Sequence, residues 1–381
     1  MKSVFPILAI STFSAMLGAG IIAPILPLYA ENLGASGIWI GVIFAGFSIS
    51  RTLFMPIVGN LSDKKGRRIF ICIGLFAYTV ISLGYVWANS VIELTLVRLV
   101  HGGASAMIIP IAQAYIGELS PEGEEGKWMG YFNAAFFTGF GFGPLMGGVL
   151  TDYFTENVAF YTMGALNLLA FILAFLFLPE IDNRKVSTGD SRTSFFEMRE
   201  SGVMKGLVSY QIVYAIGRGS FFTFLPLFGA TSLTPELTAG QIGALLAIHM
   251  LIVSTTQLLS GKIADVFNRK GLIIAGGLVS VTFLALVPAT HNFWQLLALC
   301  IFGALGGTLS LPAASALAVD EGKKYGMGST FGIFNMAMST GMIAGPLIGG
   351  LIADTMNISS IFYFGAGMGL LGTALFAWFT R

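Results

Sequence analysis

Long apolar segments separated by short polar loops run through the whole chain. A helix needs about 20 predominantly apolar residues to cross the hydrocarbon layer of a bilayer, and these segments reach that length. The pattern therefore predicts an all-α membrane protein with twelve transmembrane helices. The predicted spans are 5–29, 38–58, 69–88, 91–117, 129–152, 159–179, 205–229, 240–260, 271–290, 293–319, 329–353 and 360–380.

The basic residues are confined to alternate loops. Of the 20 Lys and Arg, three lie inside predicted spans, namely Arg51, Arg98 and Arg218. All the others lie at the two termini or in loops on the same side, and the opposite loops contain none. Loops rich in Lys and Arg stay in the cytoplasm, so both termini are predicted to be cytoplasmic. The same rule explains the basic run 64–68 without a nucleic-acid partner.

Composition supports a bilayer as the surroundings of this chain. Hydrophobic residues make up 55% and charged residues 10%, whereas a soluble domain carries about 25% charge. Cys72 and Cys300 lie in different apolar segments, so neither a disulfide framework nor a metal cluster is expected, and no cofactor is predicted. The first apolar stretch, which continues to Tyr29, is too long for a signal peptide and is interpreted as a retained span.

A shift of 202 positions aligns the second half of the chain with the first. The polar stretch 180–204 between them is interpreted as a cytoplasmic linker that joins two homologous six-helix bundles, 1–179 and 205–381. Internal repeats are typical of secondary transporters, in which the substrate site lies between the repeats near mid-membrane. The aligned pairs include Gly59 with Gly261, Asp63 with Asp265, Arg67 with Arg269, Pro110 with Pro312, Asn133 with Asn335 and Pro144 with Pro346.

The loop after the second span carries a first motif. It reads GNLSDKKGRR from Gly59 to Arg68, and its repeat reads GKIADVFNRK from Gly261 to Lys270. The first copy resembles motif A of the major facilitator superfamily, and the second is a degenerate copy. The resemblance implies the twelve-helix fold of that family. It also implies a gate that holds the cytoplasmic side closed, while the alternative is a solvated loop that only sets topology. The implied gate residues are Asp63, Arg67, Arg68, Asp265 and Arg269.

The fourth span contains Arg98, Gly102 and Ala106 at a spacing of four, which resembles motif B of the same family. The resemblance implies a role for Arg98 in proton coupling, together with Glu93 or His101. A guanidinium inside a span is costly and normally faces a bundle interior or a watery cavity. The alternatives are an arginine that locks the helix through backbone carbonyls, a solvated Glu93 at the rim and a neutral core His101.

The fifth and eleventh spans each carry a Gly-x-x-x-Gly-Pro-x-x-Gly pattern. Small residues four apart let helix backbones approach closely, and a proline inside a helix bends it. The pattern resembles motif C, the antiporter motif, and implies export, although a close kinked interface also suits any rocking transporter. The first span, with Gly18, Pro24 and Pro27, resembles the twelve-span drug:proton antiporter branch. The packing residues are Gly139, Gly143, Pro144, Gly147, Gly341, Gly345, Pro346 and Gly349.

Polar residues within the spans are candidates for a substrate cavity. No carboxylate lies deep in a predicted span, whereas three arginines do. A cavity lined by them would favour neutral or anionic compounds over cations. Histidines titrate near neutral pH when hydrated, so His101 and His249 are candidate proton carriers. The alternative is that both are neutral histidines buried in the core. The candidates are Arg51, Arg218, Gln113, Asn133, Gln211, Tyr214, His249 and Asn335.

These patterns favour a monomeric, proton-driven exporter of small amphipathic compounds in the inner membrane, working by alternating access with protons, substrate and lipid as its partners. An importer or uniporter of a small metabolite, such as a sugar or organic anion, is the alternative. An enzyme is not expected, because the chain has no HExxH and no paired aspartates on facing spans. No Gly-Lys pair precedes Ser or Thr, so ATP drive is not expected. A channel or a membrane sensor stays a more distant alternative.

Overall fold

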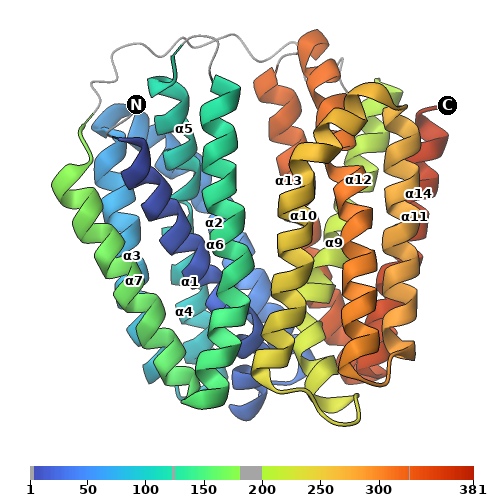
Figure 1. Cartoon of the computed structure of the whole chain (residues 1–381), viewed down its shortest axis with the longest axis horizontal. Helices are drawn as coiled ribbons and strands as arrows, with labels where there is room; N and C mark the ends of the chain where they lie inside the picture. Colours follow the sequence, from blue (N-terminus) through green and yellow to red (C-terminus); the bar gives the residue numbers. More distant parts are fainter. Residues whose placement is uncertain (1–3, 122–124, 181–199, 326) are drawn as a thin grey trace. The chain divides into compact units, whose positions relative to one another are not determined.

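The computed structural model describes the chain except residues 1–3, 122–124, 181–199 and 326, and the side chains of 117, 125–127, 257–265 and 327–329 also lie outside the description. Every regular element of the described part is a helix (Figure 1). The elements are α1 (Phe5–Asn32), α2 (Gly37–Lys65), α3 (Arg67–Trp87), α4 (Val91–Ser105), α5 (Ile109–Leu119), α6 (Glu125–Tyr153), α7 (Glu156–Phe177), α9 (Gly202–Thr231), α10 (Ala239–Val266), α11 (Arg269–Leu286), the short 3₁₀ helix η1 (Val287–Ala289), α12 (Phe293–Tyr325), α13 (Met327–Thr355) and α14 (Ile358–Phe379).

The described residues contain twelve helical stretches that are long and apolar enough to span a membrane, so the predicted fold class is confirmed. The predicted span 91–117 differs from expectation because it consists of two helices, α4 and α5. Pro110 lies in the first turn of α5, where its missing N–H costs nothing, and a proline disfavours helical backbone in the residue before it. In the repeat, α12 runs through Pro312 without a break.

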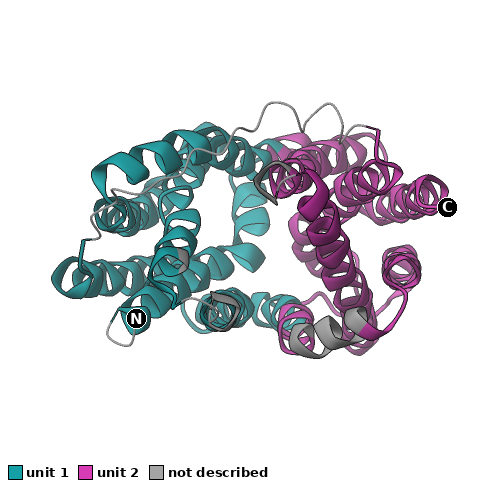
Figure 2. Cartoon of the chain, turned by 90° about the horizontal axis from the view of Figure 1, so that it is seen from above, with its two compact units in different colours: residues 1–35, 42–187, 238–247 teal, residues 36–41, 188–237, 248–381 magenta. Residues whose placement is uncertain are grey.

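The chain divides into two compact units (Figure 2). Unit 1 comprises residues 1–35, 42–187 and 238–247, and unit 2 comprises residues 36–41, 188–237 and 248–381. Most of the predicted linker, 180–204, lies outside the described residues. Helix α9 begins at Gly202, inside the last part of that predicted stretch.

The same pairs of helices pack together in each unit. In unit 1, α1 packs against α6 and α7, and α3 packs against α4 and α7. In unit 2, α9 packs against α13 and α14, and α11 packs against α12 and α14. These pairs correspond under the sequence repeat, so the two units share one packing plan.

Glycines allow α1 and α6 to approach closely in unit 1. A Cβ atom on Gly143 would lie 2.6 Å from the carbonyl oxygen of Leu17, and one on Gly147 would lie 2.2 Å from that of Ile21. Both distances are far below van der Waals contact. The glycines of α6 therefore pack directly against the backbone of α1, as the small-residue pattern predicts.

Unit 2 builds the same crossing between α9 and α13. A Cβ atom on Gly345 would lie 2.4 Å from the carbonyl oxygen of Ile216. Gly143 and Gly345 are 202 positions apart, whereas their partners Leu17 and Ile216 are 199 apart. The first helix of each unit therefore aligns with an offset of 199 rather than 202.

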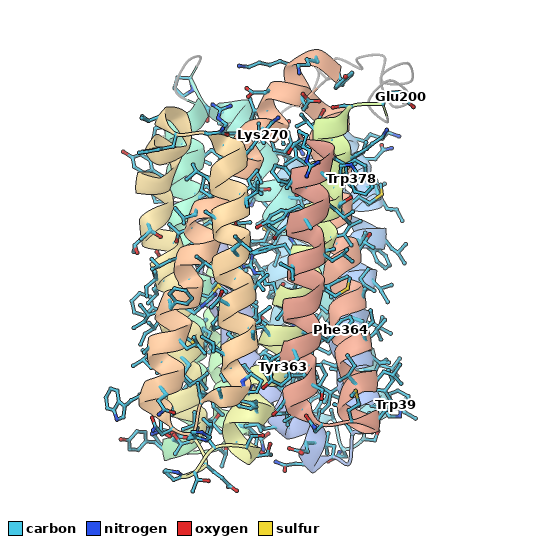
Figure 3. All side chains as sticks on the ribbon, turned by 90° about the vertical axis from the view of Figure 1, so that its right-hand side faces the viewer. Trp39, Glu200, Lys270, Tyr363, Phe364 and Trp378 are labelled. Atoms are coloured by element: carbon cyan, nitrogen blue, oxygen red, sulfur yellow. The ribbon has the colours of Figure 1, made fainter. Side chains whose placement is uncertain are left out.

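Exposed tryptophans lie toward opposite ends of unit 2. In Figure 3, Trp378 lies toward the same end as Glu200 and Lys270, and Trp39 lies toward the other end. Trp39 and Trp378 are 42% and 67% exposed. Tryptophan favours the two membrane–water interfaces, so this placement fits helices that cross a bilayer.

Candidate functional site

Arg67, at the start of α3, binds two carboxylates from neighbouring helices. Its Nη2 lies 2.9 Å from Oδ1 of Asp63 in α2. Its Nε donates to Oε2 of Glu118 in α5 at 2.8 Å, and its Nη2 donates to the other oxygen of the same carboxylate. The residue is only 6% exposed. This bidentate, charge-assisted arrangement fixes the arginine in one orientation.

Arg68 does not join that cluster. Its side chain donates a hydrogen bond to the carbonyl oxygen of Phe175 at the end of α7, and its guanidinium lies 5.7 Å from the centre of the Phe175 ring. The predicted gate residues Arg67 and Arg68 thus have different partners. Arg67 ties α3 to α2 and α5, and Arg68 ties α3 to α7.

The second copy of the motif repeats the central ion pair. Arg269, at the start of α11, binds Asp320 in α12. Glu118 and Asp320 are 202 positions apart, so the repeat relates both partners of both ion pairs. The side chain of Asp265 lies outside the described residues. Sequence reasoning missed Glu118 and Asp320, although the repeat offset offered a signal, since each half carries a carboxylate at the aligned position.

Arg98 lies at the centre of a buried polar cluster in unit 1. Its Nη1 donates to the hydroxyl of Tyr85 at 3.4 Å, and its Nε donates to the carbonyl oxygen of Ile43 at 3.4 Å. The guanidinium lies 4.5 Å from the centre of the Phe47 ring, within cation–π range. Arg98 is 8% exposed. Among the described residues, the contacts of the Arg98 side chain are thus with aromatic rings, a hydroxyl and a backbone carbonyl rather than with a carboxylate.

His101 continues this cluster. The Tyr85 hydroxyl lies 2.8 Å from Nδ1 of His101. Because the hydroxyl oxygen accepts from Arg98, its own proton is available for His101 Nδ1, and both hydrogen bonds of the Tyr85 hydroxyl are then compatible. His101 Nε2 is buried and has no hydrogen-bond partner among the described residues. The result is a hydrogen-bonded chain from Arg98 through Tyr85 to His101.

Glu93 lies apart from this chain, at the beginning of α4. Its carboxylate accepts a hydrogen bond from the backbone N–H of Asn89 at 2.7 Å, and its own N–H donates to the hydroxyl of Ser90. Ser90 is the N-cap of the helix, and the Glu93 side chain reaches back to Asn89, the residue before the N-cap, in a variant of the capping box. The structure therefore brings Arg98 together with His101 but not with Glu93, and Glu93 has the position of a rim residue.

The predicted cavity residues divide into two groups. Arg51 has a buried Nε without a hydrogen-bond partner among the described residues. Gln113 and Asn335 are exposed and Asn133 is half-buried; Gln113 and Asn133 belong to unit 1 and Asn335 belongs to unit 2. The second group lies in unit 2, where Tyr214, Arg218 and His249 line one cavity and Gln211 is buried in the same helix as Tyr214.

The family model of the Major Facilitator Superfamily matches residues 8–235 and 207–381. The chain belongs to the Major Facilitator Superfamily. Members of this family are transporters and not enzymes, so the chain is a multi-pass membrane transporter of small molecules. The family assignment expected from the sequence motifs is thereby confirmed.

Two curated relatives from this superfamily extend over nearly the whole chain. An uncharacterized MFS-type transporter of Methanocaldococcus jannaschii is 32% identical over 371 residues, which is 96% of this chain and 95% of the relative. The quinolone resistance protein NorA of Staphylococcus aureus is 28% identical over 395 aligned positions, 98% of this chain and 95% of the relative.

Solved structures of transporters share the fold. A bacterial homologue of the human lysosomal transporter Spinster has a TM-score of 0.85 at 13% identity and covers 100% of this chain and 97% of its own. The nucleoside transporter NupG has a TM-score of 0.83 at 15% identity and covers 99% and 100%. At such identities the likeness concerns the fold alone.

Proposed function

We propose that this chain is a proton-coupled exporter of small amphipathic organic compounds that works by alternating access. The observation that carries the proton part is the buried chain Arg98–Tyr85–His101, which ends in an imidazole nitrogen without a protein partner. An ionisable group inside a span is costly and marks an ion or substrate pathway by default. The gene product would reside in the inner membrane as a monomer with both termini in the cytoplasm.

Export as the direction rests on two further observations. The relative NorA is named a quinolone resistance protein, and a membrane transporter can confer resistance by moving the drug out of the cell. The same glycine crossing occurs once in each unit, as α1–α6 and as α9–α13, and in both it uses the pattern that resembles the antiporter motif. Close backbone packing of this kind lets a helix pair move as a rigid element, as alternating access requires.

The test uses purified protein in liposomes that contain a pH-sensitive dye. A proton gradient is imposed, and norfloxacin, a cationic amphiphile, a neutral amphiphile and an anionic amphiphile are added one at a time. Proton-coupled export predicts compound-dependent dissipation of the gradient by the wild type. The signal should be lost in Arg98→Ala protein that retains its helicity and elution volume. Gradient dissipation by Arg98→Ala at the wild-type rate would contradict the role of the buried chain.

An importer or uniporter of an organic anion or other small metabolite is the second candidate. It is favoured by the cavity of unit 2, whose lining contains an arginine but no carboxylate. Counterflow of a radiolabelled compound without any proton gradient separates the two. A uniporter exchanges its substrate in that assay and leaves the internal pH unchanged, whereas a proton-coupled exporter changes it.

A further inference from the structure

Unit 2 contains a cavity that lies wholly within that unit, bounded by α9, α10, α11, α12 and α14. It comprises about 710 Å³ of space not filled by atoms, including space open to solvent. The described residues that line it include four large polar side chains that can bind a ligand, Tyr210, Tyr214, Arg218 and His249. The rest of the lining is apolar or small, so these side chains decide which ligand fits.

Among the described residues of its lining, the cavity carries one positive group, Arg218, and no carboxylate. Arg218 lies in the middle of α9, and its guanidinium is 5.6 Å from the centre of the Phe222 ring. The other lining residues contain no Asp or Glu. An arginine in a span normally pairs with an anion or with backbone carbonyls. A ligand carboxylate would supply the missing partner, and the planar guanidinium can bind it through two parallel hydrogen bonds.

Aromatic side chains contribute two groups of rings to the lining. His249, Phe221 and Phe283 pack against one another with ring centres 5.1 to 5.8 Å apart, and together they form one aromatic surface. Tyr210 and Tyr214 form a second group, stacked with their ring centres 5.7 Å apart. Such rings bind a flat arene through stacked and edge-to-face contacts.

Two polar groups of the lining remain for a ligand. His249 Nδ1 lies 3.0 Å from the carbonyl oxygen of Cys300. Because a carbonyl only accepts, Nδ1 carries a proton, and Nε2 is the ring nitrogen left for a ligand. Tyr210 is 2% exposed, and its hydroxyl has no hydrogen bond of good geometry to a described residue, although Ser310 lies near it.

The repeat shows that the cavity is a feature of unit 2. Under the offset of 202, its lining residues Ser280, Gly303 and Gly277 correspond to Tyr78, His101 and Leu75, three bulky side chains that are fully buried in unit 1. Unit 1 therefore fills the positions that unit 2 leaves small. In addition, Arg218 and His249 correspond to Ala19 and Phe47, under the offsets of 199 and 202.

We propose that this cavity binds small aromatic carboxylates and that they are a transported substrate class of this protein. The Arg218 guanidinium holds the carboxylate, the arene packs against the aromatic surface of Phe221 and Phe283, and His249 Nε2 faces a polar substituent. The assignment of these compounds as substrates rests on the transport function proposed above, whereas their binding does not.

The first test is equilibrium binding to the purified full-length protein, measured by titration calorimetry in nanodiscs. Benzoate, benzamide and benzamidine are the probes, because they share shape and differ in charge. The expected order is benzoate tightest and benzamidine weakest. Arg218→Gln should weaken benzoate binding by about tenfold or more, since a charge-assisted pair is worth at least about one decade of affinity. Arg218→Lys should retain part of it, and the surface variant Arg381→Gln should match wild type.

His249→Phe places in unit 2 the residue that unit 1 has at the aligned position. It keeps an aromatic ring at this position, so benzoate should still bind. Salicylate carries an added hydroxyl that can contact His249 Nε2, so it should bind the wild type more tightly than benzoate and lose that advantage in His249→Phe. All variants are compared at wild-type helicity and elution volume. The proposal is overturned if benzoate shows no saturable binding to folded wild type, if benzamidine binds as tightly as benzoate, or if Arg218→Gln leaves benzoate binding unchanged.

Transport is then measured with radiolabelled benzoate in liposomes. The substrate assignment is supported if wild-type protein shows benzoate counterflow and Arg218→Gln protein does not. If benzoate binds but is not transported, while other amphiphiles drive proton flux, the substrate assignment is wrong and the exporter function stands. If benzoate moves without any proton flux, the proton-coupled function fails and the substrate assignment stands.

Discussion

Unit 1 and unit 2 share one packing plan but fill their interiors in opposite ways. In unit 1, Arg98, Tyr85 and His101 occupy the interior with a buried hydrogen-bonded chain. The aligned residues of unit 2 are Cys300, Val287 and Gly303, which are small and uncharged. Gly303 lines the cavity of unit 2, whose charge is supplied by Arg218 of α9. Duplication thus produced two similar scaffolds, and we infer that one carries the proton element and the other the ligand site.

The largest expected effect comes from removing the charge that distinguishes unit 1. Arg98→Gln should reduce proton-coupled flux to the background of protein-free liposomes, because Tyr85 and His101 lose the group that orients them. Cys300→Ala, at the aligned position of unit 2, should leave proton flux close to wild type. The measurement is dye-reported proton flux at matched protein content. Equal losses in the two variants would show that the halves do not differ in this role.

The twelve spans and the glycine crossings could be predicted because their signals are local in sequence. Hydropathy needs only about 20 consecutive residues, and the spacing of Gly139, Gly143 and Gly147 defines one helix face. The partners Glu118 and Asp320 lie 51 residues from Arg67 and Arg269 along the chain. Hydropathy and motif matching do not report contacts over that distance. Only comparison of the two repeats could have singled these carboxylates out.

The cavity was predicted only in part, for a related reason. Tyr214, Arg218 and His249 were identified as polar residues within apolar segments, and the structure places all three in one cavity. Gln113, Asn133 and Asn335 were identified on the same criterion and are not part of it. Polarity within a span does not say which way a side chain points, and the small residues Gly277, Ser280 and Gly303 that leave the space carry no polarity signal at all.

A second prediction concerns the helix crossings that the two units share. Gly143→Ala and Gly345→Ala should each lower the free energy of unfolding by about 3 kcal/mol, because a new Cβ would overlap a carbonyl oxygen of the partner helix. Gly130→Ala, where nothing lies within 4 Å of the new Cβ, should be neutral or slightly stabilising. Unfolding in detergent followed by far-UV circular dichroism measures this. A cost for Gly130→Ala equal to that for Gly143→Ala would contradict the packing explanation.

A third prediction compares the two ion pairs at the helix starts. The Arg67 side chain is 8% exposed and binds Glu118 through two hydrogen bonds, whereas the Arg269 side chain is 29% exposed and its partner Asp320 44%. A double-mutant cycle with Arg67→Gln and Glu118→Gln should give a coupling energy of about 2 kcal/mol. The cycle with Arg269→Gln and Asp320→Asn should give less than about 1 kcal/mol. Coupling energies that are equal, or in the reverse order, would mean that burial does not set the strength of these pairs.

The smallest expected effects arise where the two copies of the first motif start the next helix differently. Gly66 precedes α3 with a φ of 94°, a conformation that L side chains rarely adopt, and Asn268 precedes α11 with a φ of −60°. The Asn268 side chain accepts hydrogen bonds from the N–H groups of Lys270 and Gly271. Asn268 therefore caps its helix with a side chain, whereas Gly66 relies on backbone freedom.

This difference predicts that substitutions at the two positions lower stability for different reasons and by different amounts. Gly66→Ala should cost about 2 kcal/mol of unfolding free energy through backbone strain. Asn268→Ala should cost about 1 kcal/mol through the lost cap, and Asn268→Gly only a few tenths, roughly 0.3 kcal/mol. The same dichroism assay orders the three variants. If Gly66→Ala were as stable as wild type, the backbone conformation with positive φ before α3 would not be required. The presence of Asn268 instead of glycine in the second motif copy would then need no explanation by capping.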